Sequence, residues 1–224
     1  MQDQFHSCAQ LIEYVQSIGI LPLLSIKNFV GWSAEEVVDE ECQYTKLPDG
    51  GWEWPLWEWK GEIIRESGCA YGKFFHGKAA FISQEWWPHY CNYRRSIFPK
   101  IEEGSIEETI LEVLKLGGSM TTRDLRRACG FIGKNERSKF DAYITRLQMC
   151  GRILTEDFVY PHDKHGNRYG WGWSLLNLPE MIMGNSACQL ACSSEESKCL
   201  LLNHLHNILP NASEKSLLNL LEKK

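Results

Sequence analysis

Three glutamates alternate with four tryptophans between residues 52 and 62, and carboxyl groups in such surroundings can transfer protons. Burial against indole rings disfavours the charged carboxylate and raises its pKa toward the range useful for acid or base catalysis. The same rings could stack a nucleobase that has left a duplex. We therefore take Glu58 and Glu62 as candidate catalytic residues. A second interpretation is a tryptophan-rich core from which the glutamates face solvent, since aromatic rings commonly build cores.

Basic residues gather in the middle of the chain, although the net charge of the whole protein is −5. Residues 115–152 contain 9 Lys and Arg against 3 Asp and Glu, whereas residues 1–62 contain 3 against 11. A polyanion would therefore meet the 115–152 segment. Binding of a nucleic acid there should weaken steeply with salt, because each phosphate contact releases counterions.

Cysteine and histidine supply the other reactive groups, and their spacing predicts neither a metal site nor a cofactor. The nine cysteines are an odd number spread over 224 residues, which is typical of reduced thiols rather than of a disulfide framework. No glycine-rich phosphate loop is present. The cysteines and histidines of the C-terminal tail match no common zinc spacing; they are Cys188, Cys192, Cys199, His204 and His206. We expect no metal and no cofactor.

The segment that carries the basic residues has the element order of a winged helix. Ser105 with Glu108, and Thr121 with Asp124, are spaced as helix N-caps, and glycines follow each helical pattern. The expected elements are a helix ending at Gly117, helices over 122–129 and 135–150, and strands over 152–160 and 169–176. Three helices and a charged hairpin predict a helix-turn-helix with a β-hairpin wing.

A winged helix can place its third helix in the major groove of duplex DNA while the wing contacts phosphate. With Phe140, Ile144 and Leu147 turned to the core, the opposite face of that helix is small and polar with basic borders. Cations of the preceding helix and of the wing could pair with phosphates. The predicted DNA-binding residues are Arg123, Arg126, Arg127, Lys134, Asn135, Ser138, Lys139, Thr145, Arg146, Lys164, His165 and Arg168. The alternative is that these charges only solvate the surface of a protein-interaction module.

The whole chain predicts an α+β protein in three parts. The expected elements outside the winged helix are helices over 5–17, 34–43, 84–95, 195–209 and 214–223, and a small antiparallel sheet from 56–66, 69–75 and 78–82. The predicted boundaries are 1–98 for an aromatic-rich mixed α/β region, which we leave open as winged-helix-like, 105–180 for the winged helix and 185–224 for a helical tail. We find no internal repeat.

The first 16 residues lack the basic and apolar regions of a secretory signal, and no apolar run reaches the roughly 20 residues of a membrane span. These patterns predict a cytoplasmic protein without a membrane segment. The leucine-bearing tail is expected to pack on the body of the same chain or on a second copy, so a homodimer is one of the predicted assemblies.

Three segments resemble the YcaQ/AlkZ-type winged-helix DNA glycosylases, and we identify the chain as similar to the AlkZ-related proteins. They are residues 58–62, residues 78–88 and the winged-helix segment that ends with residues 169–176, and in order of elements the similarity covers residues 19–178. The resemblance implies tandem winged helices that enclose duplex DNA. It also implies hydrolysis of the N-glycosidic bond of alkylated or crosslinked bases in DNA repair.

One departure from that family concerns catalysis. Its catalytic Gln-x-Gln or Gln-x-Asp motif follows an early apolar segment, and the matching residues 18–26 here contain neither Gln nor Asp. Base excision needs a group that positions or activates water, which an apolar side chain cannot do. Three interpretations follow: a non-catalytic DNA-binding relative, an active N-glycosylase that uses Glu58 or Glu62, and a protein-interaction module whose acidic half meets a basic partner.

Overall fold

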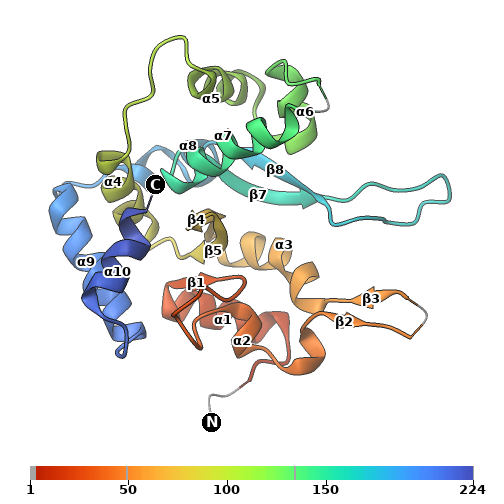
Figure 1. Ribbon diagram of the computed structural model, residues 1–224, viewed down its shortest axis with the longest axis horizontal. Helices are drawn as coiled ribbons and strands as arrows, with labels where there is room; N and C mark the ends of the chain where they lie inside the picture. Colours follow the sequence, from red (N-terminus) through yellow and green to blue (C-terminus); the bar gives the residue numbers. More distant parts are fainter. Residues whose placement is uncertain (1–3, 49, 134, 224) are drawn as a thin grey trace.

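The computed structural model describes residues 4–48, 50–133 and 135–223. Helices and small antiparallel sheets form two units that follow one another along the chain, and a pair of helices packs beside them (Figure 1). Within the described residues, none of the helices has both the length and the apolar character to cross a bilayer. The α+β class predicted from the sequence is therefore confirmed at the level of helices with small antiparallel sheets.

The first unit consists of three helices and a three-stranded sheet. Its elements are α1 (Cys8–Ile18), β1 (Ile20–Pro22), α2 (Ala34–Val37), α3 (Pro55–Ser67), β4 (Ala70–Phe75) and β5 (Lys78–Ile82). The strands pair antiparallel in the order β1-β5-β4. Between α2 and α3 the chain adds a short turn of helix, η1 (Glu40–Cys42), and a hairpin of β2 (Thr45–Lys46) and β3 (Trp52–Glu53).

The second unit repeats this plan with a much longer hairpin. Its elements are α5 (Ile106–Gly117), β6 (Met120–Thr121), α6 (Thr122–Ala128), α7 (Arg137–Met149), β7 (Leu154–Val159) and β8 (Trp173–Asn177). The strands pair antiparallel in the order β6-β8-β7. The predicted caps are confirmed, since Ser105 accepts from the Glu108 backbone N–H and Thr121 accepts from that of Asp124.

The two units share one topology although the sequence shows no repeat. In each, a helix and a short strand precede two helices and a hairpin, and the first strand pairs with the last. The two units are alike in the order and pairing of their elements. Different side chains can form the same elements as long as the apolar pattern suits each of them.

The units pack on one another in an approximately reciprocal way. Helix α7 of the second unit lies on β4 of the first, α3 of the first lies on β7 of the second, and β4 and β7 are neighbours. On one side, Gln148 accepts from the Lys73 backbone N–H at 3.2 Å. On the other, Arg65 and Asp157 form an ion pair at 2.6 Å. Each third helix is therefore partly covered by the hairpin of the other unit.

The connection between the units and the tail form one helical layer at the side of the molecule. It contains α4 (Trp87–Ile97), α8 (Pro179–Met183), η2 (Asn185–Cys188), α9 (Ser194–Ile208) and α10 (Glu214–Glu222), and α9 packs on α4 (Figure 1). The fully buried Arg94 donates from α4 to the backbone carbonyls of Met149, Leu221 and Lys223. The tail therefore packs on the body of its own chain; a homodimer stays a prediction.

The predicted strand over 56–66 is wrong, because this segment is helix α3. Pro55 supplies the preset backbone angle of a first helical turn, and Leu56, Ile63 and Ile64 bury one helical face. Aromatic residues had favoured a strand by composition. The third strand of the sheet comes instead from β1, which pairs with β5 from Ile20 opposite Ile82.

Two predicted helices are shorter than expected. The helix over 34–43 ends at Val37, because Val38 is extended and forms a bridge with Phe5. The helix over 84–95 begins at Trp87, with Pro88 in its first turn. Ser83 does not cap it: its hydroxyl has no hydrogen-bond partner among the residues that the structure describes.

Candidate nucleic-acid interface

A cleft of about 520 Å³ lies between the two units. The first unit contributes Trp57 from α3 and the lysines of the β4–β5 hairpin, Lys73 and Lys78, and the second contributes Arg137 and Trp171. Its volume is in the range of pockets that hold small organic groups. It is therefore too small to enclose a whole duplex.

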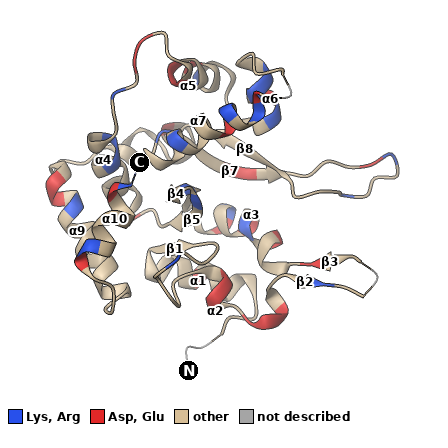
Figure 2. Cartoon of the chain, in the orientation of Figure 1, with Lys and Arg blue, Asp and Glu red and all other residues tan. Residues whose placement is uncertain are grey.

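Cations from both units line this cleft and the hollow next to it. The second hollow, of about 320 Å³, is lined by Arg123, Arg126 and the shared Arg137. We call Lys73, Lys78, Arg123, Arg126 and Arg137 the cation surface. Figure 2 shows Lys and Arg on α6 and on the neighbouring end of α7.

Most of the cation surface is not neutralised within the chain. Lys73, Lys78 and Arg123 are exposed, and Arg126 is half-buried. In the described part of the chain none of these four residues forms an ion pair with a carboxylate. Arg137 lies 3.8 Å from Asp141, its neighbour on the next turn of α7. Exposed charges without partners attract anions more strongly than charges already paired.

Tryptophans form the aromatic wall of the cleft and hold the long hairpin in place. The rings of Trp52 and Trp171 stack with their centroids 4.2 Å apart, and Trp57 donates its indole N–H to the Trp171 carbonyl at 3.3 Å. Trp54 stacks on Trp57 at 4.8 Å. The base of the β7–β8 hairpin is thus fixed to α3 and β3 of the other unit, while Trp171 stays 44% exposed.

The predicted DNA-binding residues of α6 and of the start of α7 lie at the surface. Arg123 places its guanidinium 5.1 Å from the ring centre of Trp173, and Arg127 is exposed. Arg126 is turned back and donates to the Phe131 carbonyl at 2.9 Å. Also exposed are Asn135, Ser138 and Lys139; Lys134 lies outside the described residues.

The C-terminal half of the predicted face of α7 is engaged within the chain. Thr145 accepts a hydrogen bond from the Lys73 amine at 3.2 Å and lies beside the β4–β5 turn at Gly77. Arg146 pairs with Glu107 of α5 at 3.3 Å. At Thr145 this face is therefore covered by the first unit, whereas Arg146 stays exposed and is paired with a carboxylate of its own unit.

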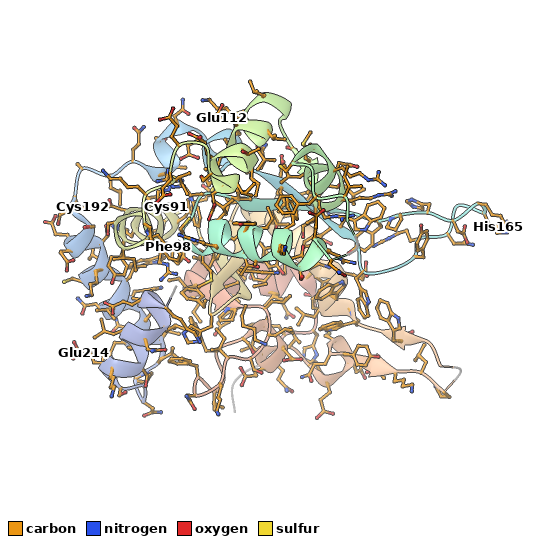
Figure 3. The ribbon with its side chains drawn as sticks, turned by 45° about the horizontal axis from the view of Figure 1, so that its top comes forward. Cys91, Phe98, Glu112, His165, Cys192 and Glu214 are labelled. Atoms are coloured by element: carbon orange, nitrogen blue, oxygen red, sulfur yellow. The ribbon has the colours of Figure 1, made fainter. Side chains whose placement is uncertain are left out.

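Of the predicted DNA-binding residues in the β7–β8 hairpin, two are open to solvent and one pairs within the chain. Lys164 and His165 are exposed, and Figure 3 shows His165 at the far end of the β7–β8 hairpin, pointing away from the body. Arg168 instead bends back to the first unit, where it pairs with Glu58 at 2.7 Å and lies 3.6 Å from the ring centre of Tyr160. The structure does not bring Arg168 to the cation surface.

The candidate carboxylates face solvent from α3 and do not line the cleft. Glu58 is held by Arg168, and Glu62 lies beside Cys8 of α1, where burial and then the nearby Glu62 charge raise the thiol pKa to about 12. The glutamates thus face solvent as in the second interpretation, but the four tryptophans around them are half-buried rather than part of a buried core. A catalytic role for Glu58 or Glu62 stays a prediction.

Sequence analysis missed a buried lysine next to the cleft. Lys60 is 0% exposed, and its amine lies 3.8 Å from the ring centre of Trp57 and 4.2 Å from that of Phe158. It donates to the Trp57 carbonyl at 2.7 Å and to the Tyr160 hydroxyl at 3.3 Å. Desolvation lowers its pKa to about 7. A lysine within an aromatic segment carries no sequence signal that distinguishes burial from exposure.

It also missed Lys73, Lys78 and Arg137. The two lysines flank a hairpin turn at His76-Gly77, a pattern that is common on solvent-exposed hairpins. Only the packing of β4 on α7 brings them opposite the second unit. For metals, no group of three His, Cys, Asp or Glu in the described ranges has the arrangement of a binding site.

Comparison with known proteins gives one result. The model of a family described as AlkZ related matches residues 5–222, a range that includes both units, α4 and the tail helices. Neither among curated proteins nor among solved structures does anything match the chain. The relationship of this chain to known proteins therefore rests on the family match.

Proposed function

Because the chain belongs to the AlkZ-related family, we propose that it binds DNA across the cleft between its units, as a divergent relative of base-excision DNA glycosylases in DNA repair. In this proposal each unit is a winged helix, with α3 and α7 as third helices and the β4–β5 and β7–β8 hairpins as wings. The shared order of elements and the shared strand order support it. A cytoplasmic location is part of the same proposal.

The observation that carries the proposal is the cation surface. Two separate units contribute its side chains to adjoining hollows, and four of the five have no carboxylate partner among the described residues. Phosphates supply the negative charge that such a surface attracts, and phosphate contacts position a protein without reading sequence. Because the whole protein carries a net charge of −5, its affinity for DNA must come mainly from the local concentration of positive charge on the cation surface.

The second unit offers the groups that would enter a groove. The turn before α7 presents Asn135, and the first turn of α7 presents Ser138 and Lys139. Recognition helices of this kind contact base edges through their N-terminal residues. Arg127 and the hairpin tip at Lys164 and His165 extend the contact to phosphates on either side. The cleft itself, with Trp57 and Trp171 in its wall, suits one unstacked base better than a duplex.

Binding in this proposal does not involve the catalytic motif of the family. Residues 18–26 contain no Gln or Asp, and they form β1 and its flanks, with Ile20, Leu21, Leu23 and Ile26 buried in the core. The segment therefore carries no carboxylate or carboxamide side chain. We therefore expect a DNA-binding protein that does not use the glycosylase route of its relatives.

Charge reversal in the cleft tests the proposal. Lys73, Lys78 and Arg137 are changed together to Glu, and affinity for a labelled duplex is measured by fluorescence anisotropy at low salt. We expect a loss of at least about tenfold, because three phosphate contacts become repulsive. The control carries the same total charge change at exposed positions outside the cleft and the 115–152 segment: Lys27, Lys100 and Lys215 to Glu.

Equal losses in both variants, or no binding by the unaltered protein, would overturn the proposal in favour of the protein-interaction module. Catalysis is measured separately, as formation of abasic sites in alkylated duplex DNA. We expect none. Release that disappears in the Glu58→Gln, Glu62→Gln protein would instead establish the N-glycosylase interpretation.

A further inference from the structure

Two cysteines far apart in the sequence lie side by side where the tail meets α4. The Sγ atoms of Cys91 and Cys188 are 3.3 Å apart, although 97 positions separate the residues. Cys91 is fully buried on α4, and Cys188 is half-buried at the end of η2. Figure 3 shows Cys91 on the side of the molecule where the tail packs. A disulfide needs the sulfurs to approach to about 2.05 Å, so closure requires a movement of just over 1 Å.

The side of α4 that faces η2 also carries donors suited to a thiolate. Trp87, Cys91 and Arg95 are spaced four residues apart and therefore share one helix face. The buried indole N–H of Trp87 has no oxygen or nitrogen acceptor among the residues described. The Arg95 guanidinium donates to the Gly151 carbonyl, to which the Cys91 thiol also donates. Arg95 also forms an ion pair with Glu180 of α8 at 2.8 Å, so a positive and a negative charge both lie near the sulfur pair.

These surroundings make the two thiols unequal. A hydrogen bond from Cys91 lowers the pKa of Cys188, and the Arg95 charge and the Trp87 indole lower it further, whereas burial and the Glu180 charge act in the opposite direction. Burial and donation to Cys188 raise the pKa of Cys91 well above its usual value. The half-buried Cys188 sulfur is therefore the better nucleophile, and the buried Cys91 sulfur keeps its proton, as in thiol pairs that react with oxidants.

We propose that Cys91 and Cys188 are a peroxide-reactive dithiol whose disulfide ties η2, at the start of the tail, to α4. The Cys188 thiolate attacks one oxygen of hydrogen peroxide, the O–O bond breaks, and protonation of the leaving hydroxide gives water and a Cys188 sulfenic acid. Cys91 then attacks that sulfur, and a second water leaves. Two thiols and one peroxide thus become one disulfide and two waters, the thiols losing the two electrons that the peroxide gains.

The disulfide would close a loop that contains the whole second unit, because residues 106–177 lie between the two cysteines. Crosslinks that close long loops restrict the unfolded chain most. Oxidation should therefore raise the thermal midpoint by about 5–15 °C, the range expected for a loop of this length in a protein of this size. The proposal does not depend on DNA binding.

The test uses the full chain, reduced and then treated with a small excess of hydrogen peroxide. Peptide mass spectrometry without reductant should show the Cys91 and Cys188 peptides joined, with loss of two hydrogen atoms, and the thermal midpoint should rise and return on addition of dithiothreitol. Cys188→Ser and Cys91→Ser should both abolish the link and the rise. Cys199→Ser, at an exposed position on α9, is the matched control and should keep both.

Three results would overturn the proposal. The first is absence of the linked peptide in the unaltered protein while its thiols are consumed. The second is a link from Cys188 to Cys192 in its place, since Cys192 is four residues away and half-buried. The third is a peroxide-induced rise in the thermal midpoint that persists in Cys188→Ser, the variant least expected to disturb the core.

Discussion

The buried Lys60 makes the stability of the fold depend on pH in a direction that can be worked out. Its pKa is about 7 in the folded protein against 10.5 in an unfolded chain. Below about pH 7 both states bind the proton, and the folded state bears the full cost of a desolvated ammonium. Between the two values the unfolded state binds more protons, so stability rises with pH across this window.

The expected size follows from the same two pKa values. Between about pH 7 and about pH 9 the free energy of unfolding should increase by about 2 kcal/mol from this one group. The amine is 0% exposed, so solvent screening does not reduce the effect. Replacing Lys60 by Met keeps the length of the side chain against Trp57 and Phe158 but removes the titration.

The assay is urea denaturation of the unaltered protein and of Lys60→Met at both pH values. The difference in unfolding free energy between the two proteins should change by about 2 kcal/mol across the interval. The stability of Lys60→Met relative to the unaltered protein should be higher at the lower pH. Parallel pH profiles would refute the reasoning. They would mean that the indole and phenyl rings stabilise the ammonium enough to offset its desolvation.

Three further predictions concern the cleft and the contacts around it. If Lys73, Lys78 and Arg137 each contact a phosphate, the charge-reversed protein should show a plot of log affinity against log salt that is less steep by about 3; an unchanged slope would place the phosphates elsewhere. Trp171→Ala should cost about 1–2 kcal/mol in urea denaturation and speed proteolysis within 160–172, because the ring stacks on another tryptophan at 4.2 Å; unchanged cleavage would show that the stack does not hold the hairpin. Gly61→Ala should destabilise by about 1–3 kcal/mol despite its gain in helix propensity, since a Cβ would lie 2.9 Å from a carboxylate oxygen of β7. Gly117→Ala, whose Cβ would meet a flexible methionine end at 3.0 Å, is the control and should be nearly neutral in the same measurement.

Local signals were sufficient wherever a few consecutive residues decide the conformation. The caps at Ser105 and Thr121 and the strand Lys78–Ile82 match the structure, because a cap or a hairpin is determined by neighbours within a few positions. The same kind of evidence failed for 56–66. In that segment the aromatic composition favoured a strand. The structure has a helix, because Leu56, Ile63 and Ile64 bury one helical face and Pro55 suits a first helical turn.

The sequence by itself determined the family, the class of elements and the concentration of positive charge in the second half of the chain. The tertiary structure alone decided which of those charges remain available. Arg146 and Arg168 are neutralised by carboxylates of α5 and α3, whereas Lys73 and Lys78 arrive at the cleft from the other unit. Pairings across more than 100 residues, such as Arg168 with Glu58, depend on how whole units pack, and no local pattern of side chains encodes that packing.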